Sequence, residues 1–389
     1  MLAKRILDVA ASPTLAISAK AKAMKKEGLD VIGFGAGEPD FDTPDFIKKA
    51  AIDALNSGKT KYTAASGLPE LKNAIKQKFQ RDNGLEYDAS CISVNVGAKH
   101  SIYNILQVIC DPGDEIIIPA PFWVSYPEMV KLASGRPVIL QTSYDNQFKI
   151  DPAALEQVIT TNTKAIILNY PSNPTGTVYT KDELKAVADI LMKHNVLVIS
   201  DEIYEKLVYD SYEFTSFASL SPEAYENTIT VNGVSKAYSM TGWRIGYIAG
   251  PKEIVDAVNR LQSHSTSNPV TFSQHGAIAA LSGDQSVIGK MVEEFDRRRH
   301  RIYELVMQIP GVRAFKPKGA FYIFPDFSEV IKMKGMNGSN EFAVQLLEEE
   351  HVALVPGEGF GAPGFVRLSY ATSMQNIENG LDRITRFST

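Results

Sequence analysis

The stretch TITVNGVSKAYSMTGWRIGYIAG, residues 228–250, joins two apolar, strand-like segments through a turn of small and hydroxyl residues. The turn contains one lysine, Lys236, and no other lysine occurs between Lys206 and Lys252. Arg244 follows eight positions later. A lysine that is desolvated or lies beside another cation becomes a nucleophile and forms Schiff bases with aldehydes. The stretch therefore predicts a strand of a sheet with either a reactive amine or an ordinary surface lysine after it.

Similar apolar segments recur along the chain and alternate with helical patterns. Such alternation is typical of an α/β fold with a mostly parallel central sheet flanked by helices, and nearly continuous apolar runs suit strands covered on both faces. The residues TKDELKAVADILMKHN open with the capping-box spacing of Thr180 and Glu183, which predicts a helix start. The predicted strands are residues 91–96, 114–120, 164–170, 196–200, 228–233 and 244–250.

A long helical pattern at about residues 286–309 is followed by shorter strands and a final helix, which predicts a smaller α+β domain. We assign residues 45–285 to the large domain, and residues 1–44 together with 286–389 to the small domain. Within the long helix, the cluster DRRRHR is expected to form a solvated face. A further helix is predicted at residues 45–57, with Leu55 on its apolar face.

Composition narrows the function classes. The 389 residues carry a net charge of −5, and 44% are hydrophobic, a balance typical of a soluble globular protein that favours neither nucleic acid nor an anionic membrane as partner. No apolar run is long enough to span a membrane, and the N-terminus lacks a signal-peptide pattern. Cys91 and Cys110 lie in apolar contexts and are expected to be reduced thiols. We therefore expect a cytoplasmic protein without a metal site.

Polar residues follow several predicted strands at the point where each strand ends. In doubly wound sheets, ligands bind beyond these carboxyl ends. Gly97 opens a turn into a helix, whose first N–H groups can bind an anion such as phosphate. Asn173 follows the strand at 164–170, and Asp201 with Tyr204 follows the strand at 196–200. Taken singly, each residue has an ordinary structural reading, as a turn, a helix N-cap or a core aromatic.

One ligand would use all of these groups together. Pyridoxal 5'-phosphate (PLP) has an aldehyde for Lys236, a ring nitrogen for an acidic partner such as Asp201, and a phosphate for the glycine turn. The segment GFGAGEPD, residues 33–40, lacks the spacing and the helix of a dinucleotide site, so Gly37 is instead expected to allow close backbone approach to a ligand. The predicted cofactor site comprises Gly97, Ala98, Lys99, Trp123, Asn173, Asp201, Tyr204, Ser235, Lys236 and Arg244.

The order of motifs along the chain resembles one family. The matching segments include GAGEPDFDTP, TKYTAASGLPELK, VGAKH, PAPFWVSYPE, NYPSNPTG, SDEIYEKL, GVSKAYSMTGWRIGY, KGAFYIFP and VRLSYA. Together they resemble the class I aminotransferases of PLP fold type I over nearly the whole chain. More closely, they are similar to bacterial aspartate aminotransferases of the subgroup that includes prephenate-active members.

The resemblance implies a reaction. It implies PLP-dependent, ping-pong transfer of the amino group from L-aspartate to 2-oxoglutarate, which gives oxaloacetate and L-glutamate. An aminotransferase for prephenate or aromatic amino acids, on the same fold, is the alternative. Amino acids and 2-oxo acids are then the only expected small-molecule partners.

The resemblance also implies roles for residues. Lys236 would bond the cofactor and move the proton, with Asp201 and Tyr204 as the other catalytic residues. Tyr62 would reach the phosphate of a neighbouring subunit, which implies a homodimer with shared active sites. Gly233 stands where many members have a serine, so one phosphate contact is expected to be missing. The implied substrate-binding residues are Gly37, Trp123, Asn173 and Arg367, with Lys99, Ser12 and Thr14 at the distal carboxylate.

Overall fold

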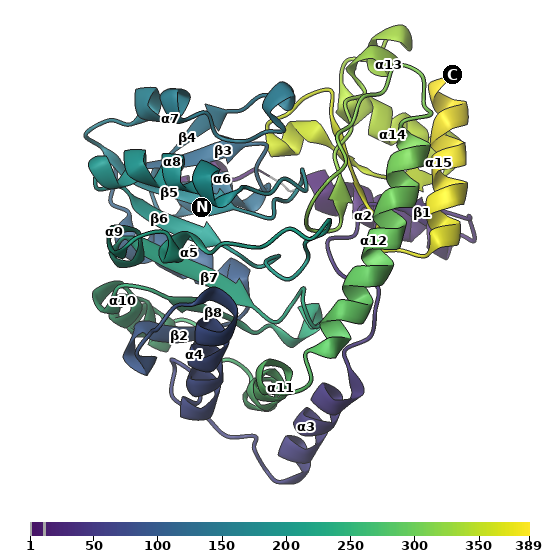
Figure 1. The fold of residues 1–389 in the computed structure, drawn as a ribbon. Helices are drawn as coiled ribbons and strands as arrows, with labels where there is room; N and C mark the ends of the chain where they lie inside the picture. The colour runs from purple at the N-terminus through teal and green to yellow at the C-terminus, as the bar shows by residue number, and fades with distance from the viewer. Residues whose placement is uncertain (1, 11–12) are drawn as a thin grey trace.

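A seven-stranded sheet forms the centre of the computed structural model, which describes residues 2–10 and 13–389. The strand order is β2-β8-β7-β6-β5-β3-β4, and only β8 runs antiparallel to its neighbours (Figure 1). The prediction of a mostly parallel sheet is therefore confirmed. The strands are β2 (Ile92–Asn95), β3 (Glu115–Ala120), β4 (Arg136–Gln141), β5 (Thr163–Asn169), β6 (Leu197–Asp201), β7 (Thr228–Gly233) and β8 (Gly246–Ala249).

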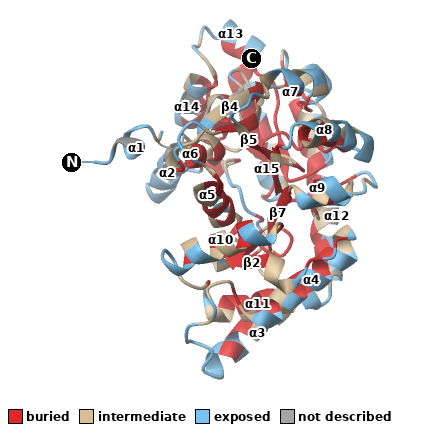
Figure 2. Ribbon diagram, turned by 90° about the vertical axis from the view of Figure 1, so that its left-hand side faces the viewer, coloured by how far each residue is buried: buried red, intermediate tan, exposed pale blue. Residues whose placement is uncertain are grey.

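Helices cover both faces of this sheet, because successive strand residues point to opposite sides. Ile116 and Ile118 pack with α5, α6 and α10 on one face, whereas Ile117 packs with α7 and α8 on the other. Figure 2 shows that buried residues follow the strands and line α5. The helices around the large sheet are α3 (Asp45–Asn56), α4 (Pro69–Asn83), α5 (Ala98–Ile109), α6 (Ser125–Leu132), α7 (Pro152–Val158), α8 (Lys181–Lys193), α9 (Pro222–Glu226), α10 (Lys252–Ser263) and α11 (Thr271–Ser282). The capping box predicted at the start of α8 is present.

A second region packs against the edge of the large sheet where the parallel strands end, and its core also takes in Ile203, Tyr204, Leu207 and Tyr209 from the segment after β6. It holds a three-stranded sheet of order β11-β12-β9 and a parallel pair of β1 and β10, which joins the N-terminal segment to the C-terminal part. The division of the chain at residues 45 and 286 stays a prediction. The elements are β1 (Ile32–Gly33), β9 (Tyr322–Ile323), β10 (Val352–Ala353), β11 (Val355–Pro356), β12 (Val366–Ser369), α1 (Lys4–Leu7), α2 (Pro13–Lys26), α12 (Ser286–Val306), α13 (Ser328–Met333), α14 (Ser339–Glu350) and α15 (Met374–Ser388).

Two expectations from the sequence are wrong. The arginine cluster of α12 is not a fully solvated face, because Arg298 is only 6% exposed and Arg299 is completely buried. Arg299 pairs with Asp210 and Asp296 and donates to the Pro317 carbonyl, so its charge is compensated inside the protein. In α3, Leu55 is exposed rather than part of the apolar face.

The remaining expectations concern membranes, cysteines and metals. Across residues 2–10 and 13–389, no helix is both long and apolar enough to cross a membrane. Cys91 and Cys110 are free. Asp210, Asp296 and His300 bring three potential metal-ligand atoms together, but both carboxylates are already paired with Arg299. The absence of a metal site stays a prediction.

Candidate active site

A cleft of about 470 Å³ lies where the carboxyl ends of the large sheet meet the second region. It is lined by turns that follow β3, β5, β6 and β7 and by side chains of β9 and β12. Parallel strands end at one edge, so residues distant in sequence converge there. The cleft unites these predicted residues: Gly37, Ala98, Lys99, Trp123, Asn173, Asp201, Tyr204, Ser235, Lys236, Arg244 and Arg367.

Lys236 follows β7, and its amine lies at the centre of the lining residues. Its Nζ donates a hydrogen bond of 2.5 Å to the carbonyl oxygen of Gly37. Burial, with a smaller contribution from the positive charges of Arg367 and Arg244, lowers the pKa of Lys236 to about 8. The carboxylates of Glu38 and Asp201 oppose this shift. An amine with this pKa is partly neutral near neutral pH, as a nucleophile or base must be.

Asp201 is the last residue of β6 and Glu202 follows it, and their carboxylates lie in different surroundings. Asp201 lines the cleft and accepts hydrogen bonds from the Tyr126 hydroxyl at 2.7 Å and the Ile203 N–H at 3.3 Å. Turns rather than a helix follow Asp201, so the alternative reading of Asp201 as a helix N-cap is wrong. Burial raises the pKa of Asp201 to about 6 despite both hydrogen bonds, which oppose the rise.

The Glu202 side chain lies instead in the core behind the strand. One of its oxygens, Oε1, accepts from the hydroxyls of Ser200 and Ser216 and from the Phe217 N–H. Its other oxygen is buried without a hydrogen-bond partner among the described residues. Burial and the nearby charge of Glu205 raise the pKa of Glu202 to about 7. Asp201 is therefore the carboxylate available to a ligand.

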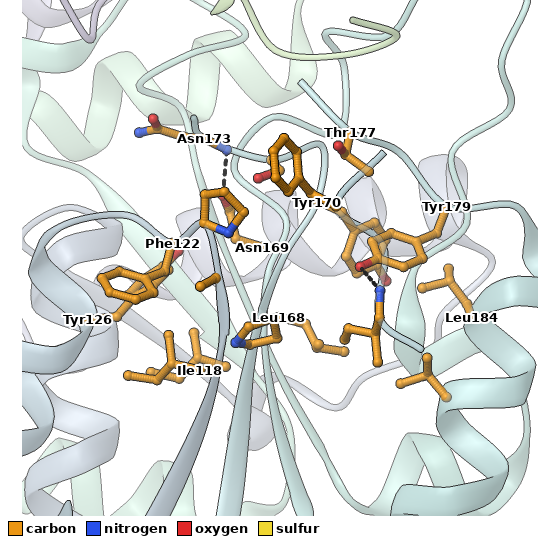
Figure 3. A pocket seen from close by; sticks show the side chains of 18 residues that line it. Ile118, Phe122, Tyr126, Leu168, Asn169, Tyr170, Asn173, Thr177, Tyr179 and Leu184 are labelled. Atoms are coloured by element: carbon orange, nitrogen blue, oxygen red, sulfur yellow. Dashed lines mark hydrogen bonds between the residues drawn. The ribbon is translucent and has the colours of Figure 1, made fainter. Parts of the chain in front are cut away.

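The turn after β5 supports one side of the cleft. The Asn173 N–H donates to the Asn169 side-chain oxygen at 2.8 Å, and the Asn169 amide donates to the Asp201 carbonyl at 3.0 Å. Figure 3 shows this turn over a small cavity, which Tyr126, Asn169 and Asn173 line on its cleft side. These bonds fix the Asn173 backbone relative to Asp201.

Arg367 on β12 is a buried cation. It is 3% exposed, and its guanidinium donates to Asn173 Oδ1 and to the Gly35 carbonyl, both at 2.9 Å. Among the described residues, no carboxylate pairs with it, and its Nε–H is buried without an acceptor. A buried charge without a counter-ion is costly, and a planar guanidinium matches a carboxylate. Arg367 therefore fits the binding of an anionic ligand.

The other end of the cleft is built for an anion as well. Gly97 has φ +84° and precedes α5, whose first N–H groups have no acceptor within the helix. A Cβ on Gly97 would lie 2.5 Å from an Arg244 guanidinium nitrogen, so a side chain here would displace that guanidinium. Lys99 Nζ lies 4.6 Å from the Trp123 ring centroid, and burial and Arg244 lower its pKa. No carboxylate in residues 2–10 and 13–389 pairs with Lys99 or Arg244, so a phosphate fits this place.

Of the other predicted residues, Gly97 directly precedes the lining residue Ala98, whereas Tyr62 lies outside the cleft. Tyr62 is 89% exposed and lines a surface hollow with Val270 and Phe272. Ser12 lies outside the described residues. Thr14 belongs to α2, but its side chain is not among those described.

Sequence reasoning also missed two tyrosines of the cleft, Tyr126 and Tyr322. Tyr322 lies within the quoted motif KGAFYIFP, although nothing local distinguishes it from a core aromatic residue.

Comparisons with known proteins agree with this geometry. Residues 29–384 match the family model described as aminotransferase class I and II. The chain is 55% identical to an aspartate aminotransferase of Geobacillus stearothermophilus, over 99% of this chain and 98% of that protein. It is 47% identical to an aspartate/prephenate aminotransferase of Cereibacter sphaeroides, over 99% and 98%. The structure of the Thermus thermophilus aspartate aminotransferase with maleate has a TM-score of 0.94 at 42% identity and 99% coverage of both chains.

The buried Glu202 gives the protein a specific pH dependence. The pKa of Glu202 is raised from 4.5 to about 7, so folding favours its protonated form. Glu202 therefore lowers the free energy of unfolding as the pH rises. This loss is absent below about pH 4.5 and grows towards pH 7, up to ~3 kcal/mol. Glu202→Gln, which keeps an accepting oxygen, should remove this decline. Free energies of unfolding measured from pH 5 to 8 test it, with the exposed Glu226→Gln as control. An unchanged pH slope in Glu202→Gln would contradict the assignment.

Proposed function

The chain belongs to the class I and II aminotransferases, and on this premise we propose that it transfers the amino group of L-aspartate to 2-oxoglutarate, giving oxaloacetate and L-glutamate. The observation that carries the proposal is the buried, unpaired Arg367 in the same cleft as Lys236. Substrates and products of this reaction all carry the α-carboxylate that such a guanidinium binds. Relatives at 53–55% identity named aspartate aminotransferase support the choice of substrate.

PLP is the cofactor that we propose for the cleft. When bound, it supplies an aldehyde for an amine and a ring that accepts the electron pair released at the substrate Cα. Lys236 would hold the aldehyde carbon, Asp201 the ring nitrogen, and Asn173 with Tyr204 the phenolic oxygen. The phosphate would lie at the start of α5, held by Gly97, Ala98, Lys99, Ser235 and Arg244.

The residues around Lys236 account for proton movement. Burial lowers the pKa of Lys236 to about 8, so the amine can take the Cα proton of the substrate. The Gly37 carbonyl, which accepts from Nζ, orients the amine, and the Gly37 N–H is available to the α-carboxylate. The hydrogen bond between Arg367 and Asn173 fixes the guanidinium, which would hold that carboxylate so that the Cα proton faces Lys236.

Lys99 is the residue that we assign to the distal carboxylate of aspartate and glutamate, with Ser12 and Thr14 as helpers. It lines the cleft beside Trp123 and has no carboxylate partner among the described residues. The second candidate is a prephenate aminotransferase, which the name of the Cereibacter relative favours. Half-reaction rates across a panel of amino acids distinguish the two.

We also propose a homodimer in the cytoplasm. Exposed apolar side chains of Ile52, Leu55 and Val270 accompany the exposed Tyr62 and fit a surface that a second copy covers. Tyr62 would then serve the phosphate of the partner's cofactor.

The free Cys91 and Cys110 suit a reducing compartment. The division into residues 45–285 and the remainder is proposed on the separate sheets of the two regions.

Lys236 should carry the cofactor covalently. Borohydride reduction followed by peptide mass mapping is expected to place the added mass on the peptide containing Lys236. Lys236→Ala should still bind PLP but lose nearly all transamination, whereas the exposed Lys252→Ala should behave like the wild type. Label on a different lysine would overturn both the assignment and the proposed function.

Lys99 should control selectivity rather than overall rate. Lys99→Ala is expected to lower kcat/KM for aspartate and glutamate by about 10- to 150-fold, the effect of losing a charge-assisted contact of ~1.5–3 kcal/mol. Aromatic and aliphatic amino acids lack the distal carboxylate and should be little affected. Exposed Lys164→Ala serves as control. A uniform loss with weaker PLP retention would instead make Lys99 a phosphate residue only.

Activity should require two chains. Lys236→Ala and Tyr62→Ala homodimers are each expected to be nearly inactive, but mixed dimers contain one site with both residues intact. Exchange of subunits between the two variants should therefore restore activity, measured alongside proof of exchange by mass spectrometry. Exchange without recovery would mean that each site is built from one chain.

A further inference from the structure

Tyr322 contacts two residues of the proposed catalytic apparatus and lies near a third. Its hydroxyl lies 2.8 Å from the hydroxyl of Tyr204, and its ring centroid lies 4.5 Å from the guanidinium carbon of Arg367. A Cβ placed on Gly37 would lie 3.5 Å from the Tyr322 hydroxyl. Tyr322 itself is completely buried. One side chain of β9 thus touches residues that we assign to the cofactor and the substrate, and it lies near the residue that orients Lys236.

The shared hydrogen bond has a preferred direction. Burial raises the pKa of both phenols, so each carries its single proton at neutral pH. If Tyr204 donated, the Tyr322 proton would have no acceptor in the described chain, because its hydroxyl has no other partner and the adjacent Arg367 is only a donor. A buried donor without an acceptor is costly. Both tyrosines line the cleft, but Tyr322 is completely buried whereas Tyr204 keeps 4% exposure, so if Tyr322 donates, the Tyr204 proton is free to face the cleft.

We propose that Tyr322 is a positioning residue, whose hydroxyl donates to Tyr204 and thereby directs the Tyr204 proton to the phenolic oxygen of the cofactor, while its ring supports Arg367. The inference rests on the proposed function. It separates two roles within one side chain, since the hydroxyl acts on the cofactor and the ring acts on the substrate carboxylate.

The hydroxyl role is tested by a pH titration of the visible absorption band of the holoenzyme. In the basic form of the bound cofactor, the phenolic oxygen would carry a full negative charge. The Tyr204 proton would stabilise this charge. Tyr322→Phe removes the bond that polarises and orients Tyr204, so the titration midpoint should rise by about 0.5–1 pH unit. The same substitution in a Tyr204→Phe background should cause no further shift. Tyr370→Phe is the matched control, because that buried hydroxyl interacts with the Ala320 carbonyl and with Tyr209 instead of with Tyr204.

The ring role is tested by ligand affinity. Tyr322→Phe should leave the Kd of the dicarboxylate maleate within twofold, whereas Tyr322→Leu should raise it about tenfold or more. An unshifted titration midpoint in Tyr322→Phe would overturn the proposal. So would an equal shift when Tyr322→Phe is made in the Tyr204→Phe background. A wild-type protein without any reducible cofactor band would instead reject the proposed function.

A further measurement tests the donor direction without the cofactor. In the cofactor-free protein, Tyr204→Phe leaves the buried Tyr322 donor without an acceptor, whereas Tyr322→Phe leaves Tyr204 facing solvent in the cleft. Tyr204→Phe should therefore lower the Tm by about 2 °C or more beyond Tyr322→Phe. The reverse order would show that Tyr204 is the donor and overturn the proposal, even if Tyr322→Phe bound cofactor too poorly to be titrated.

Discussion

The parallel direction of neighbouring strands is the constraint on which the site depends. Because β3, β5, β6 and β7 run the same way, their carboxyl ends meet at one edge, and the turns that follow bring Trp123, Asn173, Asp201 and Lys236 together. Both faces of the sheet are buried under helices, so polar groups can gather at that edge without disturbing either core. The second region closes the edge and contributes Arg367, which completes the cleft.

Much of this arrangement could be predicted from the sequence because the signals are local. An apolar run predicts a buried strand, and the residues that follow it are then expected at the carboxyl-end edge of the sheet. This reasoning predicts the positions of Asp201 and Lys236. β4 was missed because it is an edge strand with a proline and exposed polar ends instead of an apolar run. The burial of Arg299 could not be predicted, since its partner Asp210 is 89 positions away. The role of Tyr322 could not be predicted for the same reason, because its hydrogen-bond partner Tyr204 is 118 positions away in the sequence.

Electrostatics connect the separate parts of the site. Burial moves the pKa of Lys236 down to about 8 and that of Asp201 up to about 6, so both groups are displaced towards their neutral forms. The hydrogen bonds of Asp201 to Tyr126 and Ile203 limit its displacement. Arg367, Lys99 and Arg244 add positive charge that no carboxylate of residues 2–10 and 13–389 pairs with. The cleft therefore selects for ligands with two or more anionic groups.

The unpaired cations of the cleft also have a consequence for the amount of protein that a cell maintains. Charges held together without counter-ions oppose folding, and a ligand that supplies the missing anions stabilises the folded state by an amount that rises with its free concentration. The folded fraction therefore depends on ligand supply. Chains that are shifted towards the unfolded state are in general more exposed to proteolysis. Through Arg367 and its neighbours, binding of an anionic ligand therefore stabilises the folded chain.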